Sequence, residues 1–177
     1  PAVETLGSTT VICSDKTGTL TQNQMTVQQL CAAGHRYELT GVGYAPQGEI
    51  HLEQSAINPQ RHPALLECLK AGLLCNDSRL IDNGGQWGIE GDPTEVALIT
   101  SAAKAGLEIA VLEQQLPRID TLPFESQHQY MATLHHSGTA PTAFIYVKGS
   151  VESILSRCSD AYGAEAESTA LDKASIH

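Results

Sequence analysis

The stretch "VICSDKTGTL", residues 11–20, constrains the fold of this 177-residue chain more than any other part of it. A β-branched, continuously apolar run ends here at Asp15 and Lys16, just before a turn around Gly18. Such a run is typical of a strand that is buried on both faces of a parallel sheet. Ligands of α/β proteins bind beyond the carboxyl ends of such strands. We therefore expect an α/β protein in which Asp15 lies at a strand end.

The composition limits the partners of the chain. Its formal net charge is −10 at pH 7, and lysine and arginine together number only 10. Clustered basic side chains supply most nucleic-acid affinity, so we expect no nucleic-acid partner. No apolar run approaches the roughly 18 to 20 residues that cross a bilayer, so we expect this piece of chain to be soluble.

The cysteines show neither a Cys-x-x-Cys spacing nor histidines at zinc-like distances from a pair. We expect them to be reduced, buried thiols, with Cys68 and Cys75 on the core-facing side of one helix. The cysteines are Cys13, Cys31, Cys68, Cys75 and Cys158.

Two segments carry strong helix signals. In residues 62–76, five leucines recur at helical spacing and predict a core-facing stripe: Leu65, Leu66, Leu69, Leu73 and Leu74. In residues 91–106, Asp92 is a good N-cap, Pro93 suits the first helical position, and Glu95 stands where a capping box places it. Gly106 supplies the stop of that second helix. Shorter helices are expected around residues 108–115 and 150–158.

The strand signals predict a mainly antiparallel sheet. Residues 25–41 read as a hairpin around "AAGH", and residues 118–124, 129–136 and 142–149 read as further strands. Residues 41–59 read as a surface loop, and residues after Gly163 have no clear partner. We predict an α/β fold with a twisted, mainly antiparallel β-sheet flanked by helices, preceded by one strand of a Rossmann-like domain.

That preceding strand suggests a domain boundary. It has no other strand of its kind to pair with in this sequence. We therefore expect residues 1–27 to be a piece of a second domain and residues 28–177 to be the main domain, with an incomplete C-terminal end. The N-terminal strand should be poorly ordered or should pair with a neighbouring molecule, which would allow self-association.

The residues around Asp15 suit phosphoryl chemistry. A carboxylate forms an acyl-phosphate when a cation and hydroxyl or amide donors neutralise the transferring oxygens. Lys16, Thr17 and Thr19 provide such groups, and Gly18 lets the backbone approach closely. The alternative is a strand-to-loop turn capped by an aspartate.

The longer string "DKTGTLT", followed by "QNQMTV", resembles the phosphorylation motif of the P-type ATPases, ion pumps that form an aspartyl-phosphate. The resemblance implies that Asp15 is phosphorylated, that Lys16 neutralises phosphate charge, and that Thr17 contacts the phosphate. Magnesium would be held by Asp15 and by the Thr17 carbonyl. Related haloacid-dehalogenase-like phosphatases often carry a second Asp where Thr17 stands, so a longer-lived phosphoenzyme is expected here.

Three later segments resemble the nucleotide-binding domain of the same pumps: "GDPTEVAL", "PFESQHQYM" and "YVKGSVESIL". By this resemblance Glu95 lies near the adenine amino group, Phe124 stacks on adenine, and Lys148 lies close to adenine and phosphates. Gly149 would permit close approach of the ligand or a helix start. Local alternatives are a capping box for Glu95, a core position for Phe124 and a solvated surface position for Lys148.

The chain departs from the family after Phe124. Many relatives carry adjacent basic residues there, whereas this chain has Gln127, His128 and Gln129. We therefore expect weak ATP binding, with His128 as a pH-dependent substitute. His135 and His136 are expected to be exposed.

Taken together, the resemblance implies a cytosolic ATP-binding fragment of a P-type cation-transporting ATPase, in the branch of the calcium and sodium-potassium pumps. ATP and Mg²⁺ would be its ligands, and calcium is the first expectation for the transported ion. Its partners would be the remaining phosphorylation, actuator and membrane domains of one integral membrane protein. The fragment alone should bind ATP without turnover. The alternatives are a haloacid-dehalogenase-like phosphatase and a non-catalytic nucleotide-sensing or interaction domain.

Overall fold

The structure is a computed structural model that describes residues 11, 13–16, 21, 24–137, 142–165 and 167–172. Its helices are α2 (Pro63–Leu74), α3 (Pro93–Lys104), α4 (Ile109–Gln115), α5 (Val151–Leu155) and the short 3-10 helix η1 (Pro59–Arg61). Its strands are β1 (Gln29–Ala32), β2 (His35–Leu39), β3 (Ile50–Leu52), β4 (Ser55–Ala56), β5 (Arg79–Asp82), β6 (Trp87–Glu90), β7 (Arg118–Glu125), β8 (Tyr130–His136), β9 (Ala143–Gly149), β10 (Asp160–Tyr162) and β11 (Ser168–Ala170).

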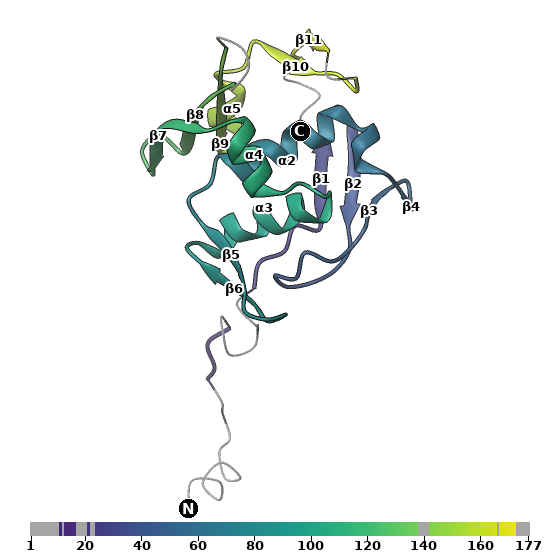
Figure 1. Ribbon diagram of the computed structural model, residues 1–177, viewed down its shortest axis with the longest axis vertical. Coiled ribbons are helices and arrows are strands. Elements are labelled where there is room, and N and C mark those ends of the chain that lie inside the picture. Colours follow the sequence, from purple (N-terminus) through teal and green to yellow (C-terminus); the bar gives the residue numbers. More distant parts are fainter. Residues whose placement is uncertain are drawn as a thin grey trace, which may run out of the picture.

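The strands of the described residues pair antiparallel throughout. They form a four-stranded sheet β1-β2-β3-β4, a three-stranded sheet β7-β8-β9 and the hairpins β5-β6 and β10-β11. Figure 1 shows α2 and α3 in the middle of the molecule, with β1–β4 on one side and β7–β9 on the other. The predicted α/β fold with mainly antiparallel strands and flanking helices is confirmed.

Helix α2 joins the two larger sheets, since it packs against β1, β9 and α3. Four of its leucines are buried in the core cluster: Leu65, Leu69, Leu73 and Leu74. The same cluster takes Tyr37 and Ile50 from the first sheet and Ile99 from α3. The predicted leucine stripe is therefore the element that builds the core.

Two hairpins differ from the expectation of loops. Residues 41–59 contain β3 and β4, joined by Glu53 and Gln54 at φ 50° and 66°. A two-residue turn with both φ values positive usually carries Asn or Gly, so this one has no ordinary sequence signal. Beyond Gly163, β11 pairs with β10, so the prediction of no partner there is wrong.

The five cysteines are free thiols, but the prediction that they are buried is wrong for three of them. Cys75 is buried, but Cys13, Cys31 and Cys68 are exposed. Cys68 stands one position before Leu69, about 100° around the helix from that buried leucine. Cys75 follows the last residue of α2 as its C-cap, so the seven-residue spacing does not place both on one helix face.

The predicted N-terminal strand lies mostly outside the described residues. Residues 11 and 13–15, which the structure does describe, are not in a strand. Within the part of the chain that is described, no helix has the length and apolar character that a membrane crossing requires.

Candidate functional site

Two of the predicted site residues meet in the structure. Lys148, near the end of β9, contacts Glu95, in the first turn of α3, with 2.5 Å between Nζ and Oε1. The two side chains are only 22% and 21% exposed. They lie 53 residues apart in sequence, so the tertiary fold brings them together. Lys148 is not the solvated surface lysine of the local alternative.

The start of α3 shows why Glu95 is available for this contact. Asp92 caps the helix as predicted, and its carboxylate accepts from the backbone N–H groups of Thr94 and Glu95 over 2.7 Å and 3.3 Å. In a full capping box, the Glu95 carboxylate would return to the N–H of Asp92. Here that N–H donates to Ser78 Oγ over 2.9 Å. The capping box is therefore half formed, and the Glu95 carboxylate is free for tertiary contacts.

The Glu95 carboxylate accepts three hydrogen bonds, one from β9 and two from residues 77 and 78. Besides Lys148, it accepts from Ser78 Oγ over 2.6 Å and from the backbone N–H of Asp77 over 3.3 Å. Burial alone would raise the pKa of Glu95, but the hydrogen bonds from Lys148 and Ser78 and the Lys148 charge outweigh burial and lower the pKa. Glu95 is therefore an ionised hydrogen-bond acceptor at neutral pH.

The register of β8 and β9 sets the direction of Lys148. Lys148 lies opposite Met131, which is buried. Directly opposed residues in an antiparallel pair share a face of the sheet. Lys148 therefore leaves the sheet on the face that packs towards the helices, where α3 presents Glu95.

The close packing of the neighbouring backbone requires a glycine at position 149. A Cβ at Gly149 would lie 2.3 Å from the carbonyl oxygen of Gln129 and 2.7 Å from Cβ of Tyr130. The same Gln129 carbonyl accepts from the N–H of Ser150, which caps α5. The turn before β8 thus packs closely against Gly149, and the approach of a ligand there stays a prediction.

Phe124 lies near the end of β7 and is 58% exposed, so it is not a core residue. The register of β7 and β8 shifts between Leu122 and Glu125. Glu125 then pairs with Tyr130, which pairs with Gly149 on β9. The exposed ring and the Lys148–Gly149 segment therefore lie at the same end of the sheet.

Gln127 and His128, which stand where basic residues were expected, contact Glu125 within the turn between β7 and β8. Gln127 Nε2 donates to Glu125 over 2.7 Å, and the His128 ring lies 3.4 Å from the same carboxylate. The backbone of Gln129 has a φ of 57°. A different cation lies nearby, because the guanidinium of Arg157 sits 4.3 Å from the centre of the Tyr130 ring.

The predicted phosphorylation residues stand apart from this site. Asp15 and Lys16 are exposed, and Thr17 lies outside the described residues. In Figure 1 the described residues before Met25, in dark purple, trail below the β5-β6 hairpin and away from β9. Among the described residues no group of three or more His, Cys, Asp or Glu side chains could hold a metal ion. Of the two expected magnesium ligands, Asp15 and Thr17, the structure describes only Asp15.

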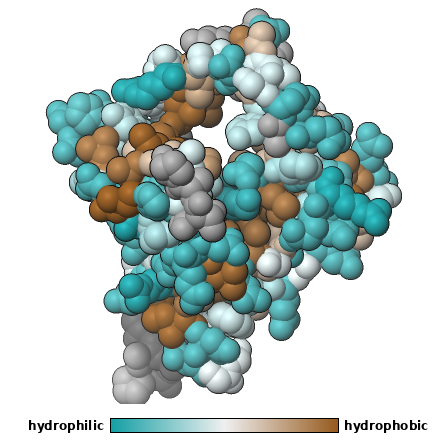
Figure 2. Space-filling model, turned by 45° about the horizontal axis from the view of Figure 1, so that its top comes forward, coloured by the Kyte–Doolittle hydropathy of each residue, from teal (hydrophilic) through white to brown (hydrophobic). Residues whose placement is uncertain are grey.

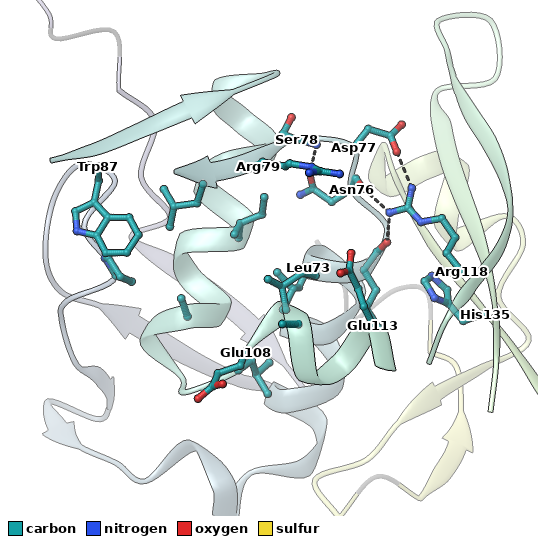
Figure 3. Close-up of a pocket in the computed structure, with 18 residues that line it drawn as sticks. Leu73, Asn76, Asp77, Ser78, Arg79, Trp87, Glu108, Glu113, Arg118 and His135 are labelled. Carbon is teal, nitrogen blue, oxygen red and sulfur yellow. Dashed lines mark hydrogen bonds and ion pairs between the residues drawn. The ribbon is translucent and has the colours of Figure 1, made fainter. Parts of the chain in front are cut away.

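A cavity of about 620 Å³ is drawn in Figure 3, and neither Glu95 nor Lys148 is among the residues that line it. Its wall includes the loop residues 76–78, and two of these, Asp77 and Ser78, also donate hydrogen bonds to Glu95. Arg118 fixes that loop, since its guanidinium donates to Asp77 over 2.7 Å and to the Leu74 carbonyl over 2.9 Å. Sequence reasoning missed Ser78 and Arg118, because neither stands in a recognisable local pattern.

His135 also lines this cavity, and the prediction that it is exposed is wrong. It is 1% exposed, with Nδ1 2.9 Å from the Leu116 carbonyl and Nε2 2.9 Å from Thr133 Oγ1. Burial lowers its pKa. His135 shares the inward face of β8 with Met131 and Thr133, and the next residue, His136, is exposed as predicted.

Comparison with known proteins gives consistent matches. The sequence model of the family "P-type ATPase, cytoplasmic domain N" matches residues 64–177. A cation-transporting ATPase of Synechocystis sp., pma1, is 52% identical over 99% of this chain and 20% of its own length. The probable cation-transporting ATPase F of Mycobacterium tuberculosis is 45% identical over 99% of the chain and 19% of its own length. A calcium-transporting ATPase of Bacillus subtilis is 38% identical over 92% of the chain and 18% of its own length. The chain thus spans about a fifth of these curated relatives.

Proposed function

Because the chain belongs to the P-type cation-transporting ATPases and contains part of their cytoplasmic domain N, we propose that it binds ATP between Glu95, Phe124 and Lys148. The observation that carries this proposal is the ion pair between Lys148 and Glu95. Two motifs far apart in sequence meet there, and helix capping does not account for the position of the Glu95 carboxylate. Gly149 supports the site by keeping the turn before β8 close to β9.

The hydrogen bonds of Glu95 favour an adenine base. A carboxylate offers about four acceptor positions, and Lys148, Ser78 and Asp77 use three of them. About one position on Oε1 therefore remains for a donor such as the adenine amino group. Guanine presents a carbonyl oxygen at the corresponding ring position, which a carboxylate repels. We expect ATP to bind more tightly than GTP.

Phe124 supplies the stacking surface. Its ring is exposed, and a base stacked on an aromatic side chain is typically worth about 1–3 kcal/mol. The charge of Lys148 is already partly neutralised by Glu95, and the turn after Phe124 has no Lys or Arg. We therefore expect modest affinity, with a dissociation constant on the order of 0.1–1 mM.

In the intact pump, the bound ATP would be presented to Asp15. A carboxylate oxygen of Asp15 would attack the γ-phosphorus, and the bond from that phosphorus to the ADP oxygen would break. Lys16 would neutralise charge on the transferring oxygens, and magnesium, when bound with Asp15 and the Thr17 carbonyl, would neutralise phosphate charge. The domain would contribute positioning of ATP and not bond making.

We place this chain in a cytoplasmic part of a membrane-embedded pump, with the other domains of that pump as its partners. Cation transport is supported by the names of its relatives, among them a calcium-transporting ATPase. Calcium is the narrower proposal, because the more similar relatives are named for cations in general. Turnover requires the whole pump.

A pair of phenylalanine substitutions tests the site. Phe124→Ala should weaken ATP binding by about tenfold, because stacking is worth about 1–3 kcal/mol per base. Phe144→Ala is the matched control, since Phe144 is also exposed, at 46%, but lies at the other end of β9. Isothermal titration calorimetry of both variants measures the difference.

Equal ATP affinity of the two variants would place the nucleotide elsewhere. Complete absence of ATP binding by the unchanged chain would favour an interaction domain, in line with the missing basic residues at Gln127 to Gln129. Turnover of small phosphate esters would instead favour a haloacid-dehalogenase-like phosphatase.

A further inference from the structure

Ser78, between α2 and β5, is the centre of a hydrogen-bonded chain. Its hydroxyl donates to Glu95 Oε2 over 2.6 Å and accepts from the N–H of Asp92 over 2.9 Å. A serine hydroxyl has a single donor, so that donor is committed to Glu95. The residue is only 9% exposed. Ser78 therefore occupies the position between Glu95 and Asp92 that a direct capping-box bond would otherwise bridge.

The backbone around Gly91 is shaped to admit this serine. Gly91 has a φ of +105°, and a Cβ there would lie 2.3 Å from Ser78 Oγ and 2.8 Å from Ser78 Cβ. Any side chain at position 91 would push Ser78 away from the N-terminus of α3. The glycine before Asp92 is thus required by the contact between Ser78 and the helix.

The loop that carries Ser78 is held without help from Lys148. Asn76 Oδ1 accepts from the N–H of Ser78 over 2.9 Å, and Asn76 Nδ2 donates to the Glu95 carbonyl over 2.9 Å. Arg118 ties Asp77 to the start of β7. Ser78 is therefore a fixed point against which the Glu95 side chain can be placed.

We propose that Ser78 is a positioning residue of the nucleotide site, whose hydroxyl turns the Glu95 carboxylate away from its own helix and towards Lys148. This inference rests on the proposed function of Glu95 and Lys148. Without the hydroxyl, the N–H of Asp92 loses its partner, and Glu95 can rotate back to accept from it in an ordinary capping box. That rotation would leave Lys148 without its carboxylate and remove the acceptor for the adenine amino group.

The first test needs no nucleotide. In Ser78→Ala, carboxyl-carbon NMR should show the pKa of Glu95 raised above its wild-type value, because the hydrogen bonds from Ser78 and Lys148 are lost and a single bond from the N–H of Asp92 replaces them. The Lys148 ammonium resonance should shift in the same variant. Ser101→Ala is the matched control, since Ser101 is also a buried serine near Glu95 in sequence but donates to the Leu98 carbonyl. An unchanged pKa of Glu95 in Ser78→Ala would overturn the proposal.

The second test uses ATP affinity in a double-mutant cycle. Ser78→Ala alone should weaken ATP binding about fivefold, and the same change in a Glu95→Ala background should have no further effect. An equal loss in both backgrounds would show that Ser78 acts through general stability, and would overturn the proposal. If the wild-type chain fails to bind ATP, the proposed function fails, while the nucleotide-free titration still decides whether Ser78 positions Glu95.

Discussion

At Glu95, a local and a tertiary use of the same side chain compete. The local pattern of Asp92 and Glu95 is sufficient for a capping box. The structure satisfies the Asp92 half and gives the carboxylate of Glu95 to Lys148, Ser78 and Asp77. Glu95 does not cap its own helix and pairs instead with Lys148, which is distant in sequence. A carboxylate placed in this way is a candidate for ligand recognition.

His135 gives a prediction about stability and pH. Its pKa is lowered by burial in the folded chain, whereas the unfolded chain has an ordinary histidine pKa of about 6.5. The unfolded state therefore binds a proton that the folded state resists, and the free energy of unfolding should fall as the pH drops below about 6.5. Urea unfolding at about pH 7.5 and about pH 5.5 measures this loss.

Two variants assign that loss to His135. His135→Gln should flatten the pH dependence of the free energy of unfolding, whatever it does to the absolute value. His136→Gln should retain the wild-type slope, because His136 is exposed. If His136→Gln flattened the slope and His135→Gln did not, the burial argument would be wrong.

Helix α3 depends on its cap. Asp92→Ala removes the acceptor for the N–H groups of Thr94 and Glu95 and should lower the free energy of unfolding by about 1 kcal/mol. Glu108→Ala is the control, because Glu108 is the N-cap residue of α4 but makes no side-chain capping hydrogen bond. Its effect should be close to zero, and chemical denaturation compares the two.

The same contacts give α3 an acid limit. Hydrogen bonds from Thr94 are the largest cause that lowers the pKa of Asp92. A carboxylate with a lowered pKa stabilises the fold above its unfolded pKa, about 3.9 for Asp, and this contribution is lost as the pH falls further. A difference between wild type and Asp92→Ala that stayed constant as the pH fell below about 3.9 would contradict this account.

Elements with strong local chemistry are predictable from this sequence. The leucine stripe and the Asp92 cap indicate α2 and α3, and Gly106 ends α3 at a φ of +78°. The β3-β4 hairpin is not predictable in this way, because Glu53 and Gln54 adopt positive φ without the usual Asn or Gly.

The candidate site divides along the same line. Glu95, Phe124 and Lys148 are found through motifs, whereas Ser78 matters only because Gly91 lets it reach the start of α3. His135 follows the inward alternation of β8, which becomes clear once the pairing with β9 fixes the register. Contacts between residues that are far apart in the sequence are therefore the part of the site that the sequence alone does not predict.

Across the whole molecule, several large apolar side chains are exposed, and Figure 2 shows apolar surface among the polar residues. Five of these side chains lie on β7 and β9: Ile119, Leu122, Phe124, Phe144 and Ile145. Exposure alone therefore does not distinguish Phe124. Phe124 differs from the other four because it lies at the end of the sheet that carries Lys148. The cavity lined by Trp87 and Glu113 contains neither Phe124 nor Lys148.

A two-dimensional NMR titration of the chain with ATP, with and without magnesium, tests the central claim most directly. We predict saturable shifts at Glu95, Phe124, Lys148 and Gly149, with a dissociation constant on the order of 0.1–1 mM and little change at Trp87. Shifts confined to the cavity around Trp87, or no saturable shifts at several millimolar ATP, would contradict the proposed nucleotide site.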